Sequence, residues 1–375
     1  MNSSPLTIAH IDAERGFSGG EVQVFLLMEG LARRGHRSVL LCPPGSAAAA
    51  EAARRGIASE TVAMRGDLDL LAVWRLTSVL RAAAPDVVHL HTGRAAWLGG
   101  LAARRAGLPA IVTRRMDRPI APGWRTRTIY ERCTRRTAAI APPVVDQLVA
   151  GGVPRDRIVL IPSAVDPARV APRLAAAAMR GALGVAADAP LLLSIAALVR
   201  RKGHDVLLDA LAALGKRGLR PRLWVAGDGP ERAVLEAQAE HLGLAAQVDW
   251  LGQRDDVGDL LAAADVFVLP SRAEGLGVAA LEAMAAGRAV VASAVGGLAE
   301  AVVDGRSGLL VPPGDAVALA AALEQLLREP ALRARLAAGG PARVAEGFLA
   351  EQMVAAYERL YREVLAGRAA PGHDQ

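Results

Sequence analysis

Aromatic residues are scarce in this 375-residue sequence, where they make up 3%. A surface that recognises sugars or single-stranded nucleic acid mainly by stacking needs more rings, so we do not expect one. Lysine is scarcer still, because Lys202 and Lys216 are the only two among 44 basic residues. This excess of arginine indicates biased nucleotide composition, and the net charge of +6 by itself identifies no partner.

Cysteine and long apolar runs are also lacking. Cys42 and Cys133 are too few for a disulfide framework and have no metal-ligand spacing around them. No apolar run reaches the length of about 18 residues that predicts a transmembrane helix. Residues 1–5 lack the basic and apolar parts of a secretory signal, so we expect a cytoplasmic protein. Hydrophobic residues reach 52%, which is enough for a sizeable core.

Positive charge concentrates in one segment. Residues 101–140 contain ten arginines and two acids, a net charge of +8 that exceeds the +6 of the whole chain. Such a patch favours nucleic acid or an anionic membrane surface. Interleaved aromatics and the signatures of nucleic-acid-binding modules are absent, so nucleic acid is not expected as a partner.

Short apolar runs alternate with amphipathic stretches along most of the chain, which is typical of βαβ units with parallel sheets. Six strands are predicted in each half, at residues 6–11, 38–42, 87–91, 110–113, 138–141 and 158–161, then 191–196, 222–226, 248–251, 266–269, 289–292 and 309–311. The predicted fold class is α/β, with two Rossmann-like parallel-sheet domains facing across a cleft.

The longest break in this rhythm, residues 166–188, contains several prolines and is predicted to be a linker. It separates an N-terminal domain of residues 1–165 from a C-terminal domain of residues 189–345. Residues 346–366 are predicted as a C-terminal helix that can pack back on the first domain, and residues 367–375 as a tail.

The most informative segment follows the predicted strand 266–269. Glu274 lies in a loop with Gly275 and Gly277, and a helix begins directly after it. A strand, a glycine-rich loop and a helix N-terminus together hold anions, because the first helical turn has unpaired N–H groups. Glu282 follows eight residues after Glu274, about two helical turns along. A lone pair of glutamates at this spacing is usually an ordinary surface feature, so the flanking motifs decide.

Further motifs flank the two glutamates in the sequence. Residues 270–315 resemble the donor-site signature of the retaining family 4 (group 1) glycosyltransferases of GT-B fold. Residues 194–203 resemble the phosphate loop of that family, and residues 227–230 resemble its next turn. The resemblance spans roughly residues 6–365 and is looser in the first half.

The resemblance implies a metal-independent enzyme, without a cofactor, that moves a sugar from a nucleotide-sugar donor to an acceptor held by the N-terminal domain. It implies that Lys202 neutralises the diphosphate and that Glu282 binds the ribose hydroxyls. It assigns Glu274, the catalytic residue, to the transferred sugar, where it steadies positive charge at the anomeric carbon. The other implied donor contacts are Gly19, Gly20, Gly275, Leu276 and Gly277.

Two positions depart from the family. Ala197 stands where many relatives carry an arginine, which leaves Arg200 or Arg201 to reach the phosphates. Many relatives have a histidine near the reacting sugar after the fifth strand, but this chain has Thr113 followed by two arginines. That histidine's role therefore cannot be transferred.

His89 and His91 lie two apart on a predicted strand and face the same way, as two metal ligands would. A third ligand at fitting spacing is missing from the sequence, so no metal is expected. The alternative is that His91 lines the acceptor side of the cleft, together with Arg114 and Arg115.

Relatives that glycosylate lipid-linked substrates often carry basic patches, so a lipid-linked or cell-envelope glycan is the expected acceptor. The protein would then lie on the inner face of the membrane, held by electrostatic attraction alone, because residues 101–140 show no strongly apolar helix face. The alternative is that the arginines are spread around the domain and paired with acids elsewhere. A nucleotide-sugar-binding or epimerase-type GT-B protein without transferase activity also stays open.

Overall fold

The structure, a computed structural model, describes residues 4–116 and 118–369. The chain divides into two compact units. The first comprises Met1–Ser163 and Ala350–Gln375, and the second comprises Ala164–Leu349. Each unit contains one parallel sheet, so the predicted α/β class with two Rossmann-like domains is confirmed.

Seven strands form the sheet in the described part of the first unit, in the order β3-β2-β1-β4-β5-β6-β7. They are β1 (Thr7–Ile11), β2 (Arg37–Cys42), β3 (Ser59–Thr61), β4 (Val87–Leu90), β5 (Ala110–Arg114), β6 (Arg136–Ala139) and β7 (Ile158–Leu160). The sequence did not predict β3, because its three residues are all exposed and carry no hydrophobic pattern.

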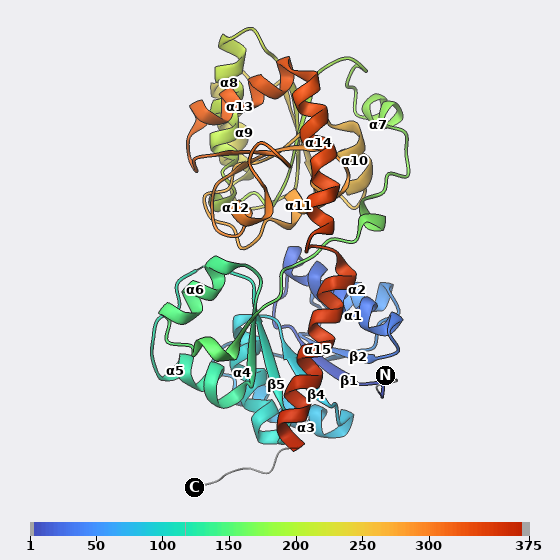
Figure 1. Cartoon of the computed structure of the whole chain (residues 1–375), viewed down its shortest axis with the longest axis vertical. Helices are drawn as coiled ribbons and strands as arrows, with labels where there is room; N and C mark the ends of the chain where they lie inside the picture. Colours follow the sequence, from blue (N-terminus) through green and yellow to red (C-terminus); the bar gives the residue numbers. More distant parts are fainter. Residues whose placement is uncertain (1–3, 117, 370–375) are drawn as a thin grey trace. The chain divides into compact units, whose positions relative to one another are not determined.

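The helices of the first unit are α1 (Gly19–Arg33), α2 (Ala47–Arg54), α3 (Leu70–Ala83), α4 (Gly93–Ala106), α5 (Trp124–Arg127), α6 (Pro142–Ala150) and α15 (Ala350–Ala369), with a π-helix η1 (Thr128–Cys133) and a 3-10 turn η2 (Arg155–Arg157). The helix α15, red in Figure 1, packs beside α1. The contact is close, because a Cβ at Gly30 would lie 2.3 Å from Cγ2 of Val354. The last six residues of the predicted tail, 370–375, lie outside the described residues.

The sheet of the second unit has the order β10-β9-β8-β11-β12-β13, and its neighbouring strands are parallel. They are β8 (Leu191–Ile195), β9 (Arg222–Ala226), β10 (Val248–Gly252), β11 (Val266–Leu269), β12 (Ala289–Ser293) and β13 (Leu309–Val311). Around it lie η3 (Pro167–Val170), α7 (Ala176–Ala182), η4 (Arg200–Lys202), α8 (His204–Lys216), α9 (Arg232–His241), α10 (Val257–Ala263), α11 (Val278–Ala285), α12 (Leu298–Ala301), α13 (Ala316–Arg328) and α14 (Pro330–Ala345).

Buried apolar side chains hold these helices on the sheet. Leu192 and Val268 from adjacent strands belong to the same core cluster as Leu211 of α8 and Leu323 of α13. The strands β8, β11 and β12 read as nearly continuous apolar runs, because a parallel sheet is covered on both faces.

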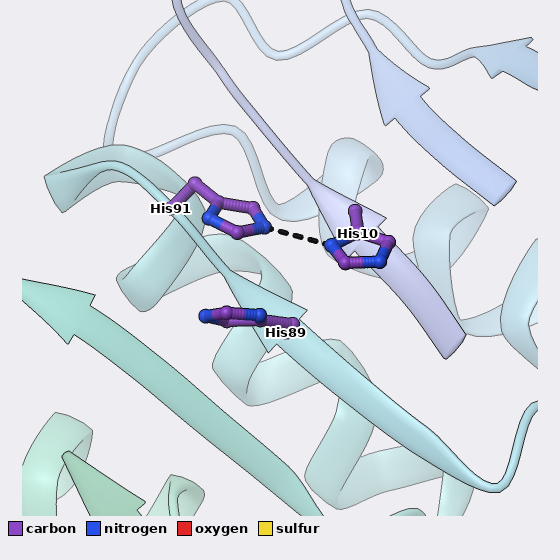
Figure 2. Close-up of side chains that lie close together, drawn as sticks. All are labelled: His10, His89 and His91. Atoms are coloured by element: carbon purple, nitrogen blue, oxygen red, sulfur yellow. Dashed lines mark hydrogen bonds between the residues drawn. The ribbon is translucent and has the colours of Figure 1, made fainter. Parts of the chain in front are cut away.

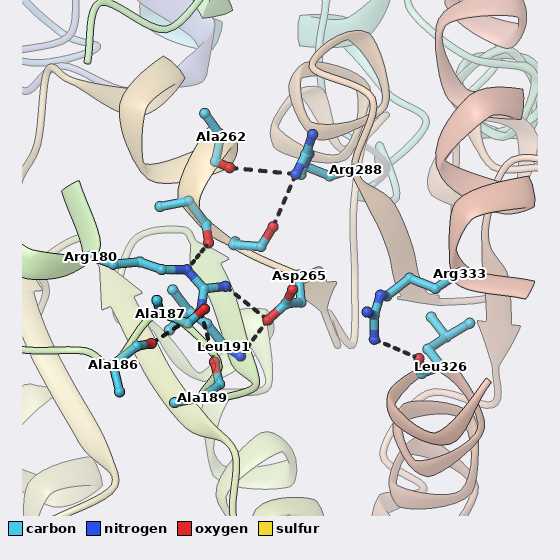
Figure 3. Close-up of polar contacts among 12 residues, drawn as sticks. Arg180, Ala186, Ala187, Ala189, Leu191, Ala262, Asp265, Arg288, Leu326 and Arg333 are labelled. Carbon is cyan, nitrogen blue, oxygen red and sulfur yellow. Dashed lines mark hydrogen bonds and ion pairs between the residues drawn. The ribbon is translucent and has the colours of Figure 1, made fainter. Parts of the chain in front are cut away.

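Residues 166–188, predicted as a linker, are part of the second unit. Arg180 on α7 is 8% exposed, and its guanidinium donates to the carbonyl of Ala189 at 2.8 Å and pairs with Asp265 at 2.9 Å (Figure 3). Asp265 also accepts a hydrogen bond from the backbone N–H of Leu191 at 2.8 Å. These bonds fix the segment to the starts of β8 and β11. Prolines in the sequence could not reveal this, since Arg180 and Asp265 are 85 residues apart.

In the described residues, no helix combines the length and the apolar character needed to cross a bilayer.

Candidate active site

Except for Gly19 and Gly20 of the first unit, the predicted donor residues lie in the loops and helices that follow strands of the second sheet. The strand β8 leads into η4 and then α8, and β11 leads into a loop at residues 270–277 and then α11. Because β8 and β11 are paired and parallel, the two loops leave the same edge of the sheet side by side.

Arg272 joins these two loops. Its backbone N–H donates to the carbonyl of Arg201 at 2.7 Å, and its guanidinium donates to both carboxylate oxygens of Asp205, at 2.5 and 2.6 Å. The loops also touch at Gly203, where φ is +70° and an added Cβ would lie 2.0 Å from the carbonyl oxygen of Pro270. Only glycine fits there, and the loops are held in a fixed relation.

The ion pair Lys202–Glu274 lies between the loops. Lys202 Nζ donates to Glu274 Oε2, and Ser271 Oγ donates to the same oxygen at 3.1 Å. The two charged side chains are only 13% and 10% exposed. A carboxylate with so little water around it depends on its cation and its hydrogen bonds. The structure thus brings the predicted phosphate-binding lysine into contact with the predicted catalytic carboxylate.

The backbone between Glu274 and α11 is buried at Gly275, Leu276 and Gly277. Gly277 caps α11 with φ +79°, and a Cβ there would lie 2.5 Å from Cδ1 of Leu298. The carbonyl of Gly275 accepts a hydrogen bond from the N–H of Gly297 at 3.1 Å. This part of the loop is therefore set by tight packing at the helix N-terminus.

Glu282 lies further along α11. Burial raises its pKa to about 7, although the positive charge of Arg169 acts in the opposite direction. Near neutral pH this carboxyl can therefore donate as well as accept a hydrogen bond.

In contrast to Lys202, the side chains of Arg200 and Arg201 are exposed, and Ala197 is exposed as well.

The first sheet carries Asp12 at the same kind of edge, directly after β1. Burial raises the pKa of Asp12 to about 7, while a hydrogen bond of 2.9 Å from the N–H of Glu14 opposes that shift. Asp12 was not among the residues predicted from the sequence, although an acid at the end of an apolar strand was the available signal. Beside it, the N–H of Gly20 donates to Ser18 Oγ at 3.2 Å. No atom lies within 4 Å of a Cβ built at Gly19, so Gly19 is the more open of the two predicted contacts.

His91 is 4% exposed and lies against Arg115. The guanidinium of Arg115 donates to His91 Nδ1 at 3.2 Å, and His91 Nε2 is bonded to His10 Nδ1 at 2.9 Å (Figure 2). Because arginine only donates, His91 Nδ1 accepts, its Nε2 carries the proton, and His10 Nδ1 accepts that proton. Burial lowers the pKa of both rings, that of His10 to about 3, so both are neutral. His91 therefore holds Arg115 and does not itself reach the surface.

His10 lies beside His89 and His91 as a third histidine, and it was not predicted from the sequence. It pairs with His89 across the β1–β4 register, and nitrogens of His10, His89 and His91 all lie within 4.8 Å of one another. His10 and His91 are 81 residues apart in the chain, so no spacing signal exists. A cation would need lone pairs that already accept hydrogens from Arg115 and His91, and it would lie beside a guanidinium. In this structure the lone pairs of His10 Nδ1 and His91 Nδ1 are used in hydrogen bonds.

Tyrosines of α15 complete this network. His89 bonds to Tyr361 OH and to Thr113 Oγ1, each at 2.7 Å, and Thr113 Oγ1 bonds to Tyr357 OH at 2.8 Å. The helix α15 thereby braces β4 and β5 directly before Arg114 and Arg115. No sequence pattern indicated these bonds, since Tyr361 lies 272 residues from His89.

Comparison with known proteins fits this arrangement. Residues 177–343 match the family described as Glycosyl transferases group 1, and residues 17–169 match Glycosyltransferase Family 4. LpsD of Rhizobium meliloti, a lipopolysaccharide core biosynthesis glycosyltransferase, is 31% identical over 94% of this chain and 98% of its own. This chain is a family 4, group 1 glycosyltransferase.

A second relative and a solved structure are also similar to this chain. LpsE of the same organism, also described as a lipopolysaccharide core biosynthesis glycosyltransferase, is 40% identical over 181 residues, which is 48% of this chain and 52% of LpsE. The structure of Anabaena HepE in complex with UDP-glucose matches with a TM-score of 0.83 and 23% identity, over 96% of this chain and 100% of that one. The GT-B fold is thus confirmed.

In this glycosyltransferase, Thr113 stands where the family resemblance would place a histidine. It is 3% exposed and its hydroxyl is bonded to His89 and Tyr357. Arg114 and Arg115 are partly exposed, so among the predicted acceptor-side residues these two, rather than the buried His91, are open to solvent.

Proposed function

We propose that this glycosyltransferase moves a sugar from a nucleotide-sugar donor to a glycan acceptor and retains the anomeric configuration. The Lys202–Glu274 ion pair carries the proposal, because it joins a phosphate-binding charge to a carboxylate at the start of α11. A bound diphosphate competes for Lys202 and releases Glu274 toward the sugar. Retention rests on the family resemblance, together with one carboxylate in place of a hydrolase-like acid and base.

The leaving diphosphate is stabilised by Lys202 and by the N-terminal end of α11, which are oriented before the reaction begins. The carboxyl of Glu282 holds the ribose hydroxyls. Transfer needs no metal or cofactor in this proposal, because the positive charge comes from the protein.

The acceptor we propose is a lipid-linked or cell-envelope glycan. LpsD and LpsE are both named for lipopolysaccharide core biosynthesis, which supports this class. Arg114 and Arg115 are placed on the acceptor side. The enzyme would then act in the cytoplasm, at the inner face of the membrane.

A screen of UDP-, GDP-, ADP- and TDP-sugars tests the proposal. A donor at about 100 times its Kd should stabilise the fold by roughly 2.7 kcal/mol. The matching radiolabelled donor should be slowly hydrolysed without acceptor, with or without a chelator, and Glu274→Gln should abolish this. Thermal stabilisation without release of nucleoside diphosphate would instead indicate a binding or epimerase-type protein.

A further inference from the structure

Exposed apolar side chains gather in one short segment of the first unit. In the described residues, eleven large hydrophobic side chains are well exposed, and four of them lie within seven residues: Leu68 (93%), Leu70 (74%), Leu71 (65%) and Trp74 (63%). We call these four the apolar patch. The last three share one face of the first turns of α3, while Ala72, Leu76 and Leu80 on the opposite side are buried. The unit thus leaves an apolar helix face uncovered.

The apolar patch lies at the edge of the sheet where the strands end. It follows β3, just as His91 follows β4 and Arg115 follows β5. In a parallel sheet these three segments leave the same edge. The patch therefore belongs to the edge that carries the proposed acceptor-side arginines.

Asp67 connects the patch to the arginine-rich segment. Its carboxylate pairs with Arg125 at 2.5 Å and lies 3.6 Å from Arg94, and its carbonyl accepts a hydrogen bond from Trp97 Nε1 at 2.8 Å. Trp124, which is 72% exposed, lies edge-on to Trp97 with ring centroids 5.5 Å apart. Trp124 thus extends the apolar surface from α3 into residues 101–140.

The charge around this surface is positive. The two acids of residues 62–74 are engaged, since Asp67 pairs with arginines and Asp69 accepts hydrogen bonds from the N–H groups of Ala72 and Arg65, at 3.0 and 3.1 Å. Four arginines lie on or beside the patch: Arg65 and Arg75 act on Asp69, and Arg94 and Arg125 lie at Asp67. Apolar side chains with a rim of a single sign fit a lipid surface with anionic headgroups better than a protein partner, whose rim carries mixed polar groups.

We propose that this edge docks on an anionic lipid bilayer, with the apolar patch and Trp124 in the headgroup–acyl boundary and the arginines on the phosphates. The attachment predicted from the sequence was electrostatic alone, because Leu68, Leu70, Leu71 and Trp74 of the apolar patch lie outside residues 101–140. The proposal rests on the proposed function in one respect. A lipid-linked acceptor would reach Arg114 and Arg115 from the membrane to which this edge is bound.

Co-sedimentation of the full chain with phosphatidylcholine vesicles, with and without phosphatidylglycerol, tests the proposal. The wild type should bind only the anionic vesicles, and Leu68→Ser/Trp74→Ser should weaken that binding by about tenfold or more. Val317→Ser is the matched control, because Val317 is 68% exposed in the second unit. It should bind as the wild type does.

Equal binding of the double variant and the wild type would overturn the apolar contact, and no binding of the wild type would overturn membrane docking. The double variant should keep the wild-type thermal midpoint and rate of donor hydrolysis. Vesicle binding without any donor hydrolysis by the wild type would defeat the proposed function and leave the docking surface standing.

Discussion

Lys202 and Glu274 form a buried ion pair between two loops, although 72 residues separate them in the chain. Neither side chain can be removed without affecting the other, because loss of one partner leaves an uncompensated buried charge. The pair therefore links the stability of the two loops to the positive charge of Lys202, which is the charge proposed to bind the donor.

Lys202→Ala should weaken nucleoside diphosphate binding by about 1.5–3 kcal/mol, the range for a hydrogen bond to a charged group. It should also lower the thermal midpoint of the ligand-free protein. Adding Glu274→Gln should restore stability without restoring affinity, because it removes the unpaired charge but not the need for a cation. Lys216→Ala is the control, because this lysine is exposed at the end of α8. If calorimetry finds unchanged diphosphate affinity in Lys202→Ala, the arginines carry the phosphates.

Glu274→Gln and Glu282→Gln should differ in kind. Loss of Glu274 should lower kcat with little change in donor KM, because the carboxylate acts on charge that develops in the transition state. Loss of Glu282 should mainly raise donor KM, because its contact is made equally in the ground state. Steady-state kinetics on both variants decides this, and small, equal effects would remove both assignments.

Glu282 should also impose a pH-dependent cost on stability. Its pKa rises from 4.5 to about 7 on folding, so the folded chain binds more protons than the unfolded chain between these values. Stability is then lost as pH rises through 7, by up to roughly 3 kcal/mol. Glu282→Gln should raise the thermal midpoint at pH 8 but not at pH 5, whereas the exposed Glu300→Gln should change neither. A gain of equal size at both pH values would argue against a buried carboxyl.

Arg115 should act on the acceptor and not on the donor. Arg115→Gln is expected to raise acceptor KM several-fold while donor hydrolysis stays at the wild-type rate. His91→Ala should have a weaker effect in the same direction, because it frees the guanidinium that His91 orients. The exposed Arg105→Gln serves as the control. If Arg115→Gln changes donor KM instead, its placement on the acceptor side is wrong.

The buried histidines should make the first unit sensitive to acid. Burial lowers the pKa of His10, His89 and His91 from 6.5, that of His10 to about 3, so the unfolded chain binds more protons below pH 6.5. Each should cost about 1.4 kcal/mol of stability per pH unit as pH falls below 6.5. Denaturant titrations between pH 7 and 5 should show this slope, and His10→Asn should reduce it by about one proton. A slope that does not change in that variant would mean that His10 is charged in the folded state.

The sequence alone determined the α/β class, because strands that are buried on both faces appear in the sequence as short apolar runs between amphipathic helices. It also marked the loop at Glu274, since Gly277 occurs where φ is positive and an added Cβ would lie only 2.5 Å from Cδ1 of Leu298. Local backbone geometry of this kind can be predicted from residues that are neighbours in the sequence.

Contacts between residues that are distant in the sequence could not be predicted in this way, and only the tertiary structure decided them. The pairing of Lys202 with Glu274, the third histidine at position 10 and the bonds from Tyr361 to His89 all arise where parallel strands end side by side. The apolar patch was not predicted either. An apolar residue in a helix can face inward or outward, and only the packing of α3 showed that Leu70, Leu71 and Trp74 face outward, because burial depends on what covers a side chain and not on the side chain itself.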